Sequence, residues 1–379
     1  MENELLIPAA LQFCVDDVGW WCGRDDRAIG GPSRTGFVRN HCAEDYRALE
    51  ELGKAIRQKL YCAFVLGEWD LEDRLGKEVP NFSHYGDAWN NSAYRDPAEM
   101  KKAVEIVNRS EYIEVAVHGL YHGYYSSDNP SHDTSDYYIR YAKDRMDMIP
   151  EEEVRMRLDH FFRLYREHGF TKPIRGFVPP SGAYRGFELS KILRDYGILY
   201  NVSSFFRPRR FAKAEDPDLL RDVFVEDDFI TVQDQGDPID WDAHDADLRP
   251  IDPFYGVMGV HWPNLLHEDP AKHGETLKKW VPYVQKCAEI FGIVISRDIG
   301  FCATQELCRK YSKIAEDDDS VAIDLRDVPQ AIGRSESFCV SVRKPIKMFE
   351  NCIVLETQQH DGFVNYELKP NGDRILVHF

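Results

Sequence analysis

The sequence predicts an α/β fold, either a parallel sheet or an α/β barrel, followed by a small antiparallel β appendage. Two observations lead to this prediction. Over roughly the first three hundred residues, short apolar runs alternate with amphipathic stretches, and such strand–helix alternation is typical of parallel sheets and α/β barrels. From about residue 320 the helical periodicity stops, and short alternating segments separated by turns indicate antiparallel strands.

The individual elements follow from apolar runs and from the helical spacing of apolar residues. Asp96 is a good N-cap, and Pro97 suits the first position of the helix that follows. Gly197 is typical of a helix C-terminus. The predicted strands are 11–15, 61–66, 112–117, 174–178, 198–203, 229–233, 255–261 and 292–296, and the predicted helices are 43–60, 97–108, 150–168, 187–196, 275–291 and 302–314.

The C-terminal part is expected to form a domain of its own. Four strands are predicted there, at residues 337–343, 351–358, 363–368 and 374–379, with turns at 359–362 and 370–373. The second turn contains Asn-Gly, a hairpin signal. We therefore expect an α/β domain over residues 1–315 and a β domain over residues 320–379. Aromatic-rich insertions at about 67–96 and 123–140 interrupt the first domain, and insertions of this length are often functional.

Composition and charge narrow the classes of partner. The chain has 47 Lys and Arg against 65 Asp and Glu, a net charge of −18, which disfavours nucleic acid and anionic membrane surfaces. No apolar run approaches the length of a membrane helix, and we see no secretory signal at the N-terminus. The nine cysteines include no Cys-x-x-Cys pair, which suits reduced thiols and a cytoplasmic location. The appendage could bind glycan, cap the barrel or form a dimer contact. A homo-oligomer is therefore one open possibility.

Two pairs of polar residues follow predicted strands directly. Asp16 and Asp17 come after the strand 11–15, and His118 comes after the strand 112–117, four residues before His122. The carboxyl ends of the strands form the catalytic face of an α/β barrel. Two His four residues apart can hold one metal ion. Either pair taken alone could also be a coincidence, and for the aspartates this is because the chain is rich in Asp.

Three later segments have a similar placement. The sequence Pro179-Pro-Ser-Gly182 forms a stiff loop that could line a pocket, although such a sequence is equally typical of a plain turn. The pair Asp240-Trp241 comes next, and His261 ends another strand, where a single His is often structural. The order of all these segments along one chain is a stronger signal than any one of them.

This order resembles that of the NodB-homology polysaccharide deacetylases, a carbohydrate esterase family with a distorted (β/α) barrel and a divalent metal ion. The segment Phe13-Cys-Val-Asp-Asp-Val-Gly19 is similar to the family's first motif, which implies Asp16 as catalytic base and Asp17 as metal ligand. His118 and His122 resemble the second motif and would complete the ligand set.

The later segments extend the resemblance over roughly residues 5–310. The pair Asp240-Trp241 is similar to the fourth motif, and His261 to the fifth, whose His is the general acid.

The chain also departs from the family pattern. Gly119 stands where the second motif usually has Ser or Thr, and Val178 where the third usually has Arg. Arg175 and Arg185 are the nearest candidates to orient the base, and Arg175 is the one we predict.

The residue types suit metal-assisted hydrolysis of an amide. Zinc is the expected ion, and Co, Ni, Fe or Mn could serve with the same ligands. The predicted substrate is an N-acetylated, or less readily an O-acetylated, sugar or glycan precursor. Aromatic residues beside the motifs suit sugar rings and core packing equally. The predicted substrate-binding residues are Pro180, Ser181, Tyr121, Asp240, Trp241 and Trp262.

Three other functions are open at this level. A hydrolase of the same fold could cleave a non-sugar amide or imide, and a barrel of this kind could bind glycans without turnover. A serine hydrolase is the weakest alternative, because the chain lacks a Gly-x-Ser-x-Gly elbow.

Overall fold

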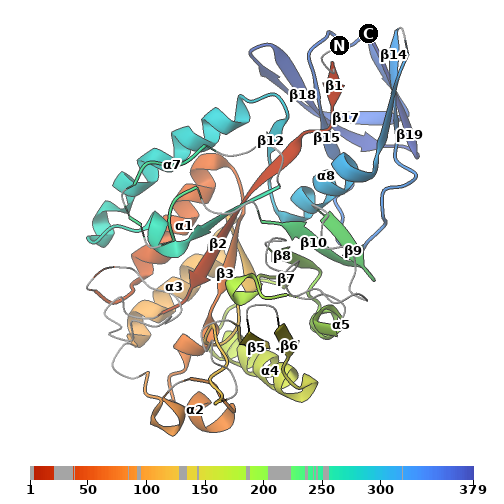
Figure 1. Cartoon of the computed structure of the whole chain (residues 1–379). Coiled ribbons are helices and arrows are strands. Elements are labelled where there is room, and N and C mark those ends of the chain that lie inside the picture. Colours follow the sequence, from red (N-terminus) through yellow and green to blue (C-terminus); the bar gives the residue numbers. More distant parts are fainter. Residues whose placement is uncertain are drawn as a thin grey trace.

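The structure of the chain is a computed structural model. A mixed α/β unit with a curled central sheet carries a β appendage at one end, and both chain termini lie beside that appendage (Figure 1). The structure describes residues 4–20, 37, 39–83, 85–91, 95–127, 135–142, 145–184, 188–203, 223–234, 238–241, 243–244, 246–250, 256–317 and 319–379.

The central sheet has the strand order β11-β2-β3-β4-β7-β8-β10-β9, with β12 also paired to β2. All of these pairings are parallel except that of β9 with β10. An isolated parallel bridge joins Asp234, directly after β10, to Val257 at the start of β11, so the sheet curls far enough to bring β10 near β11 at this point. This arrangement is consistent with a distorted barrel. The strands are β2 (Ala9–Val18), β3 (Leu60–Phe64), β4 (Ile113–Val117), β7 (Ile174–Phe177), β8 (Tyr200–Ser203), β9 (Val223–Glu226), β10 (Phe229–Gln233), β11 (Val257–His261) and β12 (Ile293–Ile295).

Most helices pack through apolar side chains on one face of the sheet, whereas the helix Ile299–Tyr311 packs with side chains of the opposite face, such as Cys14 and Tyr61, and with the appendage (Figure 1). The Asp96 side chain accepts hydrogen bonds from the backbone N–H groups of Ala98 and Glu99, as its position before Pro97 predicts. The helices are α1 (Ala43–Ile56), α2 (Leu75–Glu78), α3 (Pro97–Arg109), α4 (Glu151–Glu167), α5 (Glu188–Asp195), α7 (His273–Ala288) and α8 (Ile299–Tyr311). Short 3-10 helices lie at Leu66–Trp69, Gly86–Ala88, Pro180–Gly182, Trp262–Leu265 and Pro270–Lys272.

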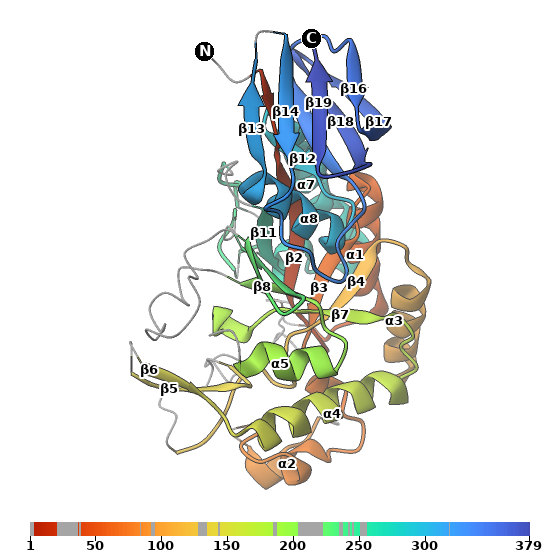
Figure 2. The ribbon, with the colours of Figure 1, turned by 90° about the vertical axis from the view of Figure 1, so that its right-hand side faces the viewer.

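The appendage consists of two antiparallel four-stranded sheets, with the orders β1-β15-β18-β17 and β13-β14-β19-β16. It stands at the end of the barrel where β2 begins, and α2 and α4 lie at the far end (Figures 1 and 2). A separate hairpin is formed by β5 (Tyr138–Ala142) and β6 (Arg145–Met148). The appendage strands are β1 (Leu5–Leu6), β13 (Lys313–Glu316), β14 (Ser320–Asp324), β15 (Phe338–Val342), β16 (Met348–Glu350), β17 (Cys352–His360), β18 (Phe363–Pro370) and β19 (Arg374–His378).

The element predictions from sequence need three corrections. The helix predicted to run to residue 60 ends at Ile56, because Arg57 adopts a left-handed conformation with φ of 57°. The helix predicted over 302–314 ends at Tyr311, and Lys313–Glu316 forms a strand instead. The Asn-Gly turn after β18 does not close a hairpin, since β18 and β19 belong to different sheets. Seven short strands were not predicted: β1, β5, β6, β9, β13, β14 and β16.

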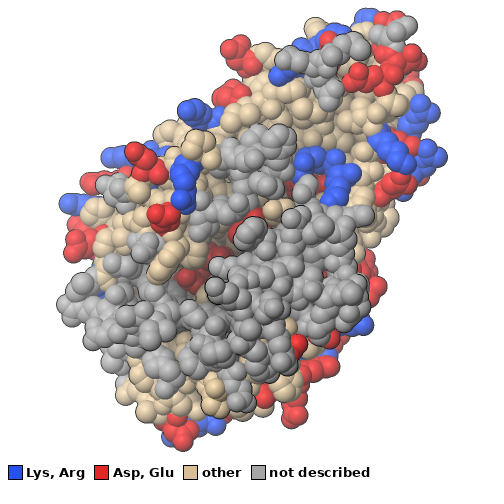
Figure 3. Space-filling view, viewed as in Figure 1, with Lys and Arg blue, Asp and Glu red and all other residues tan. Residues whose placement is uncertain are grey.

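Charged side chains of both signs lie intermixed on the face of the molecule in Figure 3. Within the described ranges, none of the helices combines the length and the apolar composition that a membrane crossing requires. The eight cysteines in those ranges are all free thiols, and most of them are buried.

Glu114 on β4 is a partly buried carboxyl whose titration is expected to affect stability. Burial, and next the charge of Asp298, raise the pKa of Glu114 from 4.5 to about 7. The folded state therefore holds a proton that the unfolded state releases between these values, and stability falls as the pH rises through this window.

In the wild type this decrease in the free energy of unfolding amounts to about 1–3 kcal/mol. We expect the Glu114→Gln variant not to show it, because its side chain does not titrate. Urea unfolding at several values between pH 4.5 and 7.5 measures it, with Glu105→Gln, an exposed carboxyl on α3, as control. Parallel stability curves for the wild type and Glu114→Gln would contradict the prediction.

Candidate metal centre

The end of β2 is irregular where the paired aspartates stand. The register between β2 and β3 shifts between Val15 and Val18, so Asp16 and Asp17 form a bulge. Asp17 has a φ of 64°, a left-handed conformation that L-residues other than Gly adopt at a cost. A bulge re-aims the side chains that it carries, and here it turns the Asp17 carboxylate toward the loop after β4.

The loop after β4 carries both histidines. His118 directly follows β4 and is buried, and His122 lies four residues further along with a φ of 59°. Gly119 between them has a φ of 100°, which favours glycine. Three left-handed residues within one small cluster indicate a backbone held in place by its surroundings, as is common at functional sites.

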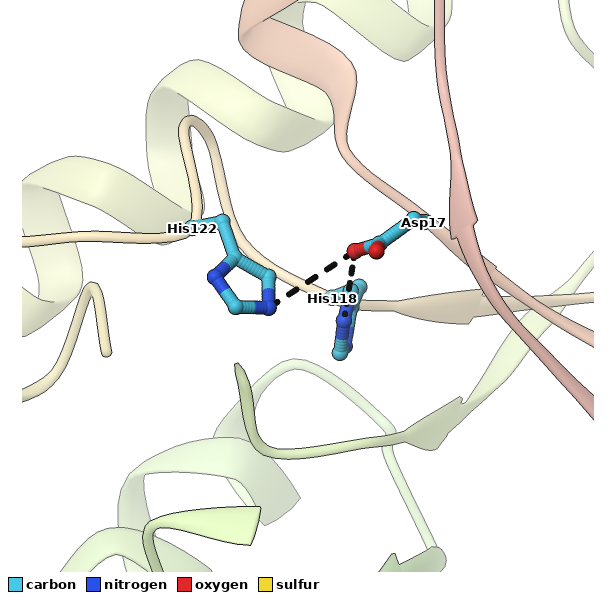
Figure 4. A group of neighbouring side chains, drawn as sticks. All are labelled: Asp17, His118 and His122. Atoms are coloured by element: carbon cyan, nitrogen blue, oxygen red, sulfur yellow. Dashed lines mark ion pairs between the residues drawn. The ribbon is translucent and has the colours of Figure 1, made fainter. Parts of the chain in front are cut away.

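Asp17, His118 and His122 converge on one point (Figure 4). The Asp17 Oδ1 atom lies 3.4 Å from His118 Nε2 and 3.6 Å from His122 Nε2. These distances are long for hydrogen bonds, but they approach the spacing of about 3.3 Å between two ligands of one tetrahedral ion. In the described part of the chain, Asp17 Oδ1 and His118 Nε2 are buried atoms without a hydrogen-bond partner. The three residues therefore form one candidate site that could bind a metal ion.

His118 is held in the tautomer that a metal ligand needs. Its Nδ1 lies 2.8 Å from the carbonyl oxygen of Val178, so Nδ1–H donates there and Nε2 presents its lone pair to the cluster. Val178 is the position where the family resemblance led us to expect Arg. The structure uses its backbone carbonyl as the partner that orients a histidine.

The charge balance of the cluster favours an ionised Asp17. Burial alone would raise the pKa of Asp17, but the neighbouring His122, His118 and His261 rings outweigh burial and hold the pKa well below its usual range. Asp17 therefore offers a carboxylate at neutral pH, the form that binds a cation.

Asp16 and His261 lie beside the cluster on neighbouring strands. They are register partners in the pairing of β2 with β11, so their backbones lie about 5 Å apart. The charge of Asp16 contributes to raising the pKa of His118. The structure thus brings together five residues singled out from the sequence: Asp16, Asp17, His118, His122 and His261.

Asp136 supports the histidine loop and was not predicted from the sequence. Its buried carboxylate accepts a hydrogen bond from the Tyr121 backbone N–H at 3.2 Å and forms an ion pair with Arg157 of α4 at 3.1 Å. Burial raises the pKa of Asp136, while Arg157 and the backbone N–H groups of Tyr121 and His122 act in the opposite direction. A Cβ atom at Gly119 would lie only 2.0 Å from Asp136 Oδ2, so the loop needs glycine there.

Asn264 plays a similar part on the other side of the site. Its side-chain oxygen accepts the His261 backbone N–H at 2.8 Å, and its amide nitrogen donates to the carbonyls of Asp240 and Ala243 at 2.9 and 2.8 Å. It ties the predicted Asp240-Trp241 segment to the end of β11. No motif marked Asn264, but a buried amide three residues after a strand-end His has the spacing of a capping residue.

The predicted substrate-binding aromatic residues fall into two groups. Tyr121 is fully buried against Phe82 and Trp89, and Trp262 is fully buried and stacked on His41 at 4.3 Å. Both placements fit core packing. Trp241 is 46% exposed, and its ring centre lies 6.2 Å from that of His261. Trp241 is therefore the predicted aromatic residue that is both open to solvent and adjacent to the cluster.

The other predicted residues are placed as follows. The Asp240 side chain is exposed and forms an ion pair with Arg249. Pro180 is buried, and Ser181 has a φ of 55° in the loop after β7. The Gly182 and Ala183 N–H groups donate within that loop, to the carbonyls of Pro179 and Pro180, rather than toward a ligand.

Arg175 is not brought to the cluster. The pairing of β4 with β7 shifts register around it, and its side chain lines a cavity with residues at the beginnings of the strands. This placement does not support the base-orienting role predicted for it. Arg185, the other candidate for this role, lies outside the described residues.

No protein-family model and no curated protein sequence matches the chain. Among solved structures, it is similar to the 4-alpha-glucanotransferase from Thermococcus litoralis, with 13% identity, a TM-score of 0.38 and coverage of 76% of this chain and 39% of that one. It is also similar to a "putative polysaccharide deacetylase" from Mycobacterium smegmatis, with 13% identity, a TM-score of 0.34 and coverage of 66% and 73%. The chain spans less than half the length of the glucanotransferase.

The contact between Gly119 and Asp136 predicts the effect of a single methyl group. We expect Gly119→Ala to displace the 118–122 loop, to weaken zinc binding at least about tenfold and to cost about 1–3 kcal/mol of stability. Zinc titration and urea unfolding measure the two effects.

Gly169→Ala is the matched control, because Gly169 has a φ of 80° with no atom near its absent Cβ. In this control the side chain in a left-handed conformation lowers stability by about 1 kcal/mol, and we expect zinc binding to be unchanged. Equal zinc affinities for the two variants would show that the loop does not depend on the contact with Asp136.

Proposed function

We propose that this chain is a metal-dependent hydrolase that removes an acyl group, in the first place N-acetyl, from a sugar or glycan precursor. The observation that carries the proposal is the placement of Asp16 and His261 beside the Asp17, His118 and His122 cluster. A purely structural metal site is usually closed by four protein ligands, whereas this cluster offers three and stands next to a carboxylate and an imidazole.

The roles of the residues follow from their chemistry. Asp17, His118 and His122 would hold the ion, and two imidazoles with one carboxylate suit zinc first. A divalent ion held there supplies a Lewis acid for an acyl oxygen and for water. Asp16 accepts the proton of the attacking water, and His261 donates a proton to the leaving amine. The two groups come from neighbouring strands, so they can serve the same bond.

A sugar is favoured over other acylated substrates by Trp241. Its half-exposed ring lies next to His261, and an exposed aromatic face suits the apolar face of a pyranose ring. Asn264 accepts from the His261 backbone and donates to the Asp240 carbonyl, which fixes the strand end and this segment relative to each other.

The first experiment is metal analysis of the purified chain. We expect about one equivalent of a divalent ion in the wild type and loss of that ion in His122→Ala and Asp17→Ala, because each change removes one of three ligands. The matched control is His378→Ala in the appendage, far along the chain from the cluster. If the two ligand variants bind metal as well as the wild type, the site is not where we place it.

A second experiment separates catalysis from metal binding. Asp16→Asn keeps the size of the side chain but cannot accept the proton, so we expect kcat for acetate release from N-acetylglucosamine oligomers to fall by about 10²–10⁴. The metal content of the variant is expected to stay at the wild-type level.

The alternatives give different results in the same assay. Sugar binding without acetate release, by a metal-loaded wild type, would contradict the proposal in favour of a glycan-binding protein. Turnover of acylated amines or cyclic imides, with none of the sugar oligomers, would instead show a hydrolase of non-sugar amides.

A further inference from the structure

A cavity opens at the end of the curled sheet opposite the metal cluster. Its volume is about 940 Å³, and it is lined by the segments that precede β3, β4 and β7 and by the first residues of α8. In a parallel sheet the beginnings of the strands lie at the opposite end from Asp17, in the last residues of β2, and from His118, directly after β4. The appendage contributes Gly333 and Ser335 to the wall.

The cavity gathers positive charge in a chain whose net charge is −18. Six basic side chains line it: Arg57, Lys59, Arg109, Lys172, Arg175 and Arg297. Lys59 and Arg297 have ion-pair partners, Asp298 at 3.7 Å and Glu367 at 2.7 Å. The other four have none among the residues that the structure describes, although acidic residues outnumber basic ones in the chain.

The acidic residues of the cavity are engaged with the backbone. The Asp298 side chain caps α8 by accepting the Phe301 N–H at 2.9 Å, and Glu114 accepts the Ile299 N–H at 3.1 Å. These two carboxylates therefore serve the first turn of α8. With the exposed Glu111, the wall carries three acidic side chains against six basic ones, so the cavity keeps an excess of positive charge.

We propose that this cavity binds a small anion that carries at least two phosphate groups. Guanidinium forks and an ammonium group are the side chains that recognise phosphate oxygens. Lys172 lies in the loop before β7, Arg175 is the second residue of β7, and Arg57 lies in the segment before β3; all three line the cavity. Lys172 Nζ donates to the Ser110 carbonyl, but it has no ion-pair partner among the described residues. Several cations without a counter-ion in one concave site favour an anion with several charges over a single carboxylate.

The buried floor supports a specific pocket rather than a basic patch. Tyr61 is almost fully buried there, with its hydroxyl 3.3 Å from the Tyr200 carbonyl and 3.4 Å from that of Phe177. The overall acidity of the chain disfavours a long polyanion such as nucleic acid, which would meet the surrounding carboxylates. A compact ligand can instead contact the basic walls alone.

The test is calorimetric titration of pyrophosphate into the full chain, dialysed free of metal and chelator so that the other end of the barrel does not contribute. We expect Lys172→Gln with Arg175→Gln to weaken pyrophosphate binding at least about tenfold, because two charge-assisted contacts are lost. The control is Arg166→Gln with Lys278→Gln, which removes the same charge from exposed positions outside the cavity. Its affinity is expected to stay within about twofold of the wild type.

Each other result overturns the proposal. An absence of measurable binding to the wild type at millimolar pyrophosphate would exclude the site. Equal weakening in both double variants would show an effect of bulk charge. Inorganic phosphate that binds as tightly as pyrophosphate would exclude a requirement for two phosphate groups.

Discussion

The buried ion pair between Asp136 and Arg157 is the interaction on which the metal centre depends most. Arg157 also donates to the backbone carbonyls of Pro80 and Asn81, so it links α4 to the first insertion, while Asp136 holds the loop that carries His122. Removal of either partner would leave a charge buried without its counterpart, which is far costlier than the loss of an exposed pair. The two insertions are therefore part of the structure that positions the cluster.

The convergence of Asp17 and His118 could be predicted from the sequence, because both follow apolar runs and the ends of parallel strands meet at one edge. The bulge at Asp17 could not, since no local pattern marks a register shift that arises from pairing with β3. The role of Asp136 could not be predicted from the sequence either. It stands in a loop region, fourteen residues from His122, and acts only through tertiary contacts. The structure thus adds to the motif the residues that hold it in place.

The aromatic residues show why neighbourhood in sequence does not settle a role. Trp262 directly follows His261, yet it turns into the core and stacks on His41, whereas Trp241 is distant in sequence and lies beside the same His261. His261 is the last residue of β11 and Trp262 the first of a 3-10 helix, so the two adjacent side chains belong to different elements. Arg175 is likewise close in sequence to the Pro179–Gly182 loop, yet it is the second residue of β7 and lines the cavity at the opposite end of the sheet.

The strand β4 connects the two sites, with Glu114 facing the basic cavity and His118 in the metal cluster. Four residues of strand separate them by about 13 Å. Hydrogen bonds to β3 and β7 fix β4 on both sides, and a packed strand has no second arrangement through which one site could signal to the other. An anion in the cavity would therefore leave the metal cluster geometrically unchanged. Its effect on the chain would be added stability of the folded state, which any ligand confers when it binds that state alone.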